Sequence, residues 1–121
     1  NALYGLIGQM NGPGGQAYTL RESWGEALRT NQPVSCSARE PDAPAPYVLP
    51  EADANASPAL AEAVGLINDG LETVRLGWVD FFFTCASNTV QQSAIQGQLN
   101  VQKAIDNFEL ARALLDTVAG N

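Results

Sequence analysis

Apolar residues between positions 57 and 87 recur at alternating intervals of four and three, the pattern of a helix with one buried stripe. Ser57 suits the N-cap position and Pro58 the first helical position. We therefore predict a long helix over 57–87. Its buried stripe consists of Leu60, Val64, Ile67, Leu71, Val74, Trp78, Phe81 and Cys85.

A second stripe with the same spacing predicts a helix over 89–119, ended by Gly120. The break between the two helices is so short that they must lie side by side and antiparallel. The first stripe is bulky and the second is rich in small residues, which favours close packing. The second stripe consists of Ala94, Gly97, Val101, Ala104, Phe108, Ala111, Leu115 and Val118.

Residues 1–31 also have helical periodicity, but Gly12–Gly15 interrupts it, with Pro13 inside the interruption. Proline and glycine at these positions predict either a kink in one helix or a turn between two helices. The two alternatives give a bundle of three long helices or one of four. The apolar positions on the expected buried faces are Leu3, Leu6, Ile7, Met10, Ala17, Leu20, Trp24, Ala27 and Leu28.

Residues 32–56 are rich in proline and poor in core-forming side chains. This composition predicts an extended connection, docked to the helices through Tyr47, Val48 and Leu49. The chain of 121 residues has the length of one domain. The expected fold is all-α: a single elongated up-and-down helical bundle.

Cys36 and Cys85 are the two cysteines, and the sequence contains no histidine with which they could form a usual zinc site. We expect a disulfide between them. The bond would bring the ends of the 1–31 and 57–87 helices together, so that these helices run parallel. Residues 37–56 can span roughly 60 Å when extended, enough to return along a helix of about 45 Å. A disulfide indicates an extracytoplasmic location: secreted, periplasmic or surface-anchored.

The net charge of −7 is concentrated in residues 40–80, which hold eight acids and one base, Arg75. Such a chain lacks the clustered lysine and arginine that bind phosphate groups, so nucleic acid is an unsuitable partner. No apolar run is long enough to insert into a membrane. We interpret the acidic stretch as a solvated face, and a cation or a basic partner is the alternative.

Catalytic motifs are absent from the sequence, which has no histidine, no GxSxG and no P-loop. The carboxylate pairs Asp69 with Glu72 and Asp106 with Glu109 have helical spacing, but without histidine they do not form a di-metal motif. We interpret them as surface groups paired with neighbouring bases. We expect no enzyme activity, no cofactor and no metal site.

Leu76, Val79 and Phe83 form a second apolar stripe on the 57–87 helix, away from the first. A helix with two apolar faces is covered on two sides. The 1–31 helix is the first candidate cover. If instead the stripe stays open, it is a binding patch to which Tyr47 and Leu49 could add.

These features favour a non-enzymatic module that binds a partner protein or a small ligand. The alternative is a structural bundle that forms homo-oligomers through the second stripe of the 57–87 helix.

Overall fold

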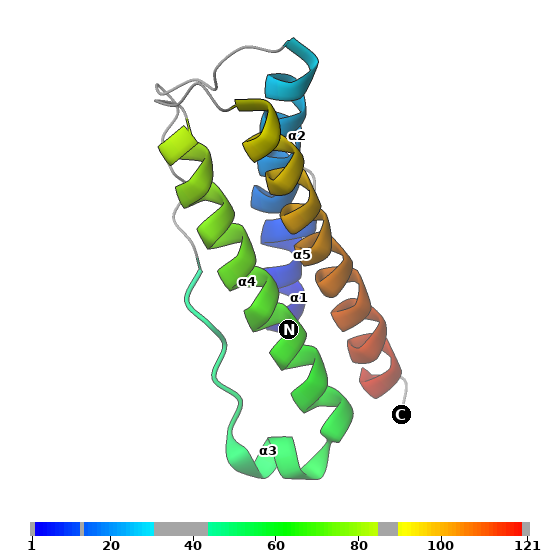
Figure 1. Ribbon diagram of the computed structural model, residues 1–121. Helices are drawn as coiled ribbons and strands as arrows, with labels where there is room; N and C mark the ends of the chain where they lie inside the picture. Colours follow the sequence, from blue (N-terminus) through cyan, green and yellow to red (C-terminus); the bar gives the residue numbers. More distant parts are fainter. Residues whose placement is uncertain (1, 13, 31–43, 85–89, 120–121) are drawn as a thin grey trace.

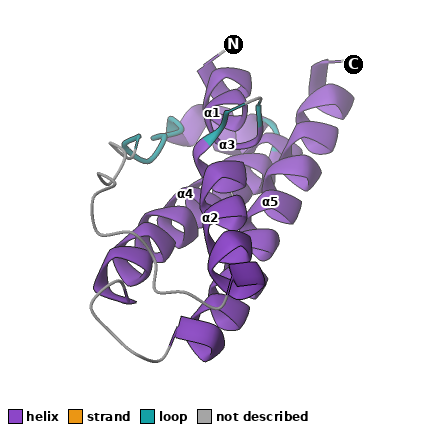
Figure 2. Cartoon of the chain, turned by 90° about the horizontal axis from the view of Figure 1, so that it is seen from above, coloured by secondary structure: helices purple, strands orange, loops and turns teal. Residues whose placement is uncertain are grey.

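The computed structural model describes residues 2–12, 14–30, 44–84 and 90–119. Within these ranges every regular element is a helix, with no strand, and three long columns lie side by side (Figures 1 and 2). The expected all-α bundle is confirmed. The helices are α1 (Ala2–Asn11), α2 (Gln16–Thr30), α3 (Glu51–Ala56), α4 (Pro58–Thr84) and α5 (Val90–Ala119).

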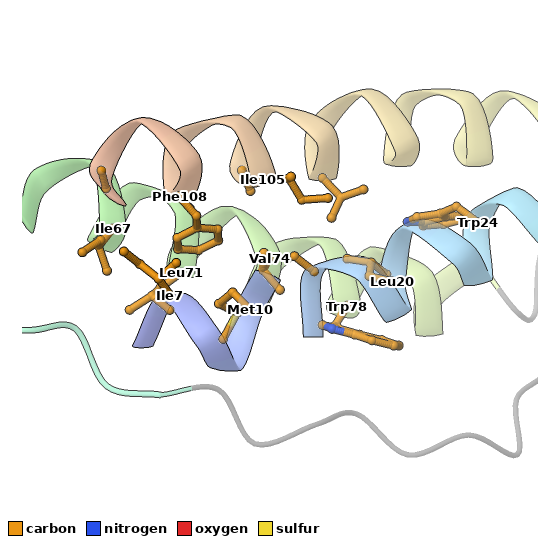
Figure 3. Packing of buried hydrophobic residues seen from close by; sticks show 14 of the residues in the cluster. Ile7, Met10, Leu20, Trp24, Ile67, Leu71, Val74, Trp78, Ile105 and Phe108 are labelled. Carbon is orange, nitrogen blue, oxygen red and sulfur yellow. The ribbon is translucent and has the colours of Figure 1, made fainter. Parts of the chain in front are cut away.

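The interruption at residues 12–15 is a kink, because α2 continues in the direction of α1 (Figures 1 and 3). The N–H of Gly12 still bonds to the Gly8 carbonyl at 2.8 Å, whereas the N–H of Gly15 bonds to Gly12. Gly14 has a φ of +72°, a conformation that costs a residue with a side chain about 1 kcal/mol or more. A Cβ on Gly15 would collide with the Met10 carbonyl. These glycines therefore allow a local kink between α1 and α2, and the chain does not fold back on itself.

The first column packs against both of the other two, parallel to α4 and antiparallel to α5. Leu20 packs against Gly77, and four residues further along both helices Trp24 packs against Phe81, so α2 and α4 advance together. Tyr4 contacts Asp116, whereas the later residue Arg21 contacts the earlier residue Gln102.

The buried stripes of α4 and α5 agree with the sequence pattern. On α4 all the described stripe residues are buried except Leu60, which is partly buried. On α5 the exceptions are Gly97 and Val118, which are partly exposed. Figure 3 shows ten labelled core residues, contributed by α1, α2, α4 and α5.

One layer of the α4–α5 contact reverses the expected arrangement of bulky and small residues. Phe108 of α5 is fully buried against Gly70 of α4, where an added Cβ would lie 2.7 Å from the ring. The space at Gly97 is filled from α2, by Trp24. Gly70 and Gly97 thus leave room for a large side chain from a neighbouring column, and this lets the three columns pack closely.

The connection before α4 is only partly extended. Residues 44–50 have no regular structure and lie along α4 (Figure 1), but Glu51–Ala56 forms the short helix α3. This helix follows Pro50 and has acidic residues in its first turn, which are favourable at a helix start. Ser57 then ends α3 through its N–H and caps α4 through its hydroxyl, which accepts a hydrogen bond from the Leu60 N–H at 3.2 Å.

Candidate functional site

The outer face of α4, defined by Leu76 and Val79, is the candidate site. The side chains of these residues are 48% and 36% exposed. Trp78 and Phe81, which belong to the buried stripe on the same turns, are each only 5% exposed. For Leu76 and Val79, therefore, the second stripe stays open, which is one of the two alternatives from the sequence. The side chain of Phe83, the third member of the stripe, lies outside the described residues.

Tyr47 and Leu49 do not join Leu76 and Val79. Both are partly buried and pack against the core. The Asn68 amide fixes their segment by accepting from the Tyr47 N–H at 2.8 Å and donating to the Tyr47 carbonyl at 2.9 Å. Asn68 precedes Leu76 by eight residues, about 12 Å along the helix. The proposed patch therefore divides into an anchored segment and an open pair on α4.

Acidic side chains surround the open pair. Asp69, Glu72 and Asp80 of α4 are all exposed. Glu72 accepts two hydrogen bonds from the Arg75 guanidinium, which lower the pKa of its carboxyl group. The other described acids between residues 44 and 80 are Glu51, Asp53 and Glu62, and these are exposed as well. This side of the molecule is therefore a solvated negative surface.

The described aromatic residues near the end of α4, Trp78 and Phe81, form core rather than a ligand site. The Trp24 and Phe81 ring centroids are 4.9 Å apart and the rings meet edge to face, as do Trp78 and Phe81 at 5.7 Å. All three residues are at least 95% buried. Such edge-to-face packing stabilises a core. The ring cluster holds the end of α2 against α4.

Polar contacts fasten the first column to α5. The Tyr4 hydroxyl donates to the Asp116 carboxylate at 2.6 Å, and this bond, with some desolvation, raises the pKa of Tyr4 above its ordinary value of 10.0. Arg21 donates to the Gln102 oxygen at 2.8 Å, and Gln102 in turn donates to Asp106 at 3.0 Å. Asp106 thus has an amide partner, where the sequence suggested a base. These contacts set the alignment of the first column against α5.

Two exposed apolar residues on α5 were missed by the sequence analysis. Ile95 and Leu99 are 54% and 61% exposed and lie one turn apart. Their signal in the sequence is a spacing of four residues outside the buried stripe of the helix. Leu110 of α5 is also exposed, and so is Val48, which therefore does not dock the extended segment as expected.

The predicted disulfide cannot be placed, because Cys36 and Cys85 lie outside the described residues. Among the residues that are described, no group of three or more acidic, histidine or cysteine side chains could hold a metal ion. None of the described helices is long and apolar enough to cross a membrane.

Comparison with known proteins gave no match to a family model, to a curated protein or to a solved structure.

Proposed function

We propose that this chain is a non-enzymatic module that binds a partner protein through the outer face of α4. The observation that carries the proposal is the exposure of Leu76 and Val79 on a helix whose opposite side is core. The two residues are three positions apart, so they stand next to each other on the helix surface. One apolar side chain of a partner can cover both.

A protein partner suits this face better than a small ligand does. Small molecules bind in concave sites that enclose most of their surface. The outer side of a helix is convex, and a second helix or a flat protein surface covers it more completely. Helix-to-helix docking of this kind uses apolar anchors spaced three or four residues apart.

The charges around the pair favour a basic partner. Asp69, Glu72 and Asp80 carry negative charge beside Leu76 and Val79, and Arg75 is bonded to Glu72. Lysine or arginine side chains flanking an apolar anchor would complement this surface. Self-association through the same face, the alternative from the sequence, would bring like charges from two copies together.

The location we propose is extracytoplasmic: secreted, periplasmic or surface-anchored. Its support is the disulfide expected between Cys36 and Cys85. The parallel direction of α2 and α4 is compatible with that bond, because the C-terminal ends of both helices lie at the same end of the bundle (Figure 1).

A designed amphipathic helical peptide of leucine and lysine provides a direct test. Its affinity is measured by fluorescence anisotropy for the unaltered protein, for the double variant Leu76→Ser with Val79→Ser, and for Leu110→Ser. Leu110 is a matched control because it is 51% exposed on another helix. We expect the double variant to bind at least about tenfold more weakly, because the apolar anchor loses its contacts.

The control should bind like the unaltered protein, added salt should weaken binding, and a peptide with glutamate in place of lysine should not bind. Equal affinity of the double variant and the Leu110→Ser control would contradict the proposal.

A further inference from the structure

Ile95 and Leu99 form a second apolar surface, on the outer side of the first half of α5. Their exposures of 54% and 61% exceed those of Leu76 and Val79. Because they are four residues apart, their side chains are neighbours on one strip of the helix. The residues that hold α5 in the core here, Ala94 and Val101, are fully buried. The strip is therefore open while its helix is firmly packed.

No charged residue occurs between positions 81 and 102, and the first charge on α5 is Lys103, which is exposed and follows Leu99 by one turn. Beside the apolar strip, Gln96 donates to Asn100 at 3.1 Å, and both residues are exposed. Arg21 of the neighbouring helix α2 reaches this half of α5 and bonds to Gln102. Up to position 102, the surface of α5 itself offers apolar groups and uncharged hydrogen-bonding groups.

Three of the described acidic groups lie at the other end of the bundle, whereas Glu22 and Glu26 of α2 flank Trp24, level with Gly97. Glu51 and Asp53 of α3 and Glu62 at the start of α4 lie at the end opposite the first turns of α5 (Figure 1). Two copies of a chain with a net charge of −7 repel each other, most strongly where these acids meet. Contact through the uncharged stretch of α5 keeps these three acids of the two copies apart.

We propose that this surface binds a second copy of the chain, with the two α5 helices antiparallel. A two-fold contact uses the same patch on both copies. With the axis midway between positions 95 and 99, Ile95 of one copy faces Leu99 of the other, and the reverse contact forms as well. The exposed positions 95, 96, 99 and 100 then lie in the contact, and none of them is charged. Lys103 of each copy then lies opposite position 91 of the other copy, which carries no charge.

This inference does not depend on the proposed function, because it uses a different helix. Loss of self-association leaves peptide binding at Leu76 and Val79 intact, and loss of peptide binding leaves self-association intact. The two outcomes are therefore distinguishable.

Sedimentation equilibrium over rising protein concentration tests the dimer. The unaltered protein is expected to form dimers, and Leu99→Glu to weaken them at least about tenfold, because a carboxylate would be buried without a partner. Leu99→Gln, which removes apolar contact without adding charge, should weaken them less. Leu110→Glu adds the same charge to α5 outside the strip and should leave the dimer unchanged. Far-UV circular dichroism confirms that each variant is folded.

Mixing two variants tests the antiparallel pairing. In a mixture of Ile95→Lys and Leu99→Glu proteins, the mixed dimer gains one lysine–glutamate pair and keeps one Ile95–Leu99 contact. We expect it to be more abundant than either homodimer. A protein that stays monomeric at every concentration, a dimer that survives Leu99→Glu, or a mixed dimer that is not favoured would overturn the proposal.

Discussion

The indole ring of Trp24 on α2 fills the space that a side chain at Gly97 of α5 would need. On its other side the ring meets Phe81 of α4, with centroids 4.9 Å apart. One aromatic residue thus joins all three columns of the bundle. The absence of a side chain at Gly97 is what allows α2 and α5 to come this close.

Gly97→Ala should therefore destabilise the fold, although alanine is the better helix former. The added methyl group overlaps a rigid ring held by Phe81, and overpacking of this kind costs about 1–3 kcal/mol. Gly65→Ala is the matched control, because Gly65 is an exposed glycine of α4 with nothing within 4 Å of an added Cβ. It should stabilise the protein by roughly 0.5–1 kcal/mol. Urea unfolding measures both, and equal effects at the two sites would refute this packing.

Asn68→Ala should release the extended segment from α4. The substitution removes both hydrogen bonds to the Tyr47 backbone, at about 1 kcal/mol each. Hydrogen exchange of the Tyr47 N–H should become much faster, while exchange in the core of α5 stays slow. Asn100→Ala, which removes only an exposed bond to Gln96, is the control and should change neither. Unchanged exchange at Tyr47 in the Asn68 variant would show that other contacts fix the segment.

The Tyr4–Asp116 contact should make stability depend on alkaline pH. The folded chain holds the Tyr4 proton more tightly than the unfolded chain does, because the hydroxyl donates to the Asp116 carboxylate. The contribution is complete below the ordinary tyrosine pKa of 10.0 and is lost as the pH rises through the raised pKa. Thermal unfolding followed across this range should show the loss in the unaltered protein and in Tyr18→Phe, but not in Tyr4→Phe. A loss of the same size in Tyr4→Phe would assign it to another group.

The disulfide between Cys36 and Cys85 is a prediction from the sequence. Intact mass after alkylation, on protein purified without reductant, should show no added alkyl groups. Reduction should then expose two thiols and lower the free energy of unfolding by about 4 kcal/mol, since the bond closes a long loop. Two alkylated cysteines before reduction would remove the basis for an extracytoplasmic location.

The long helices were predictable because periodicity, caps and breakers are local signals. Ser57 and Pro58 mark the start of α4 as expected, and the kink falls at the predicted glycines. The sequence left open whether the chain kinks or turns there, because the same glycines permit both. Contacts with α5, such as that between Tyr4 and Asp116, decide it.

The pairing of individual side chains was not predictable from the stripes. Phe108 packs against Gly70 and Trp24 against Gly97, and both choices depend on how three columns fit together. The short helix α3 was hidden by the prolines that precede it. For the candidate site, the off-stripe positions of Leu76 and Val79 were visible, but their exposure depends on which faces α1 and α2 cover.

Photo-cross-linking from position 79 tests the central claim, that the outer face of α4 binds a partner protein. A photoreactive residue replaces Val79 in one protein and Leu110 in another, and both are irradiated in the native source. The account predicts that position 79 captures a different protein with a basic contact surface, that Leu76→Ser or added salt lowers the yield, and that position 110 does not capture it. Capture of a second copy of this chain at position 79, or equal capture from both positions, would contradict the account.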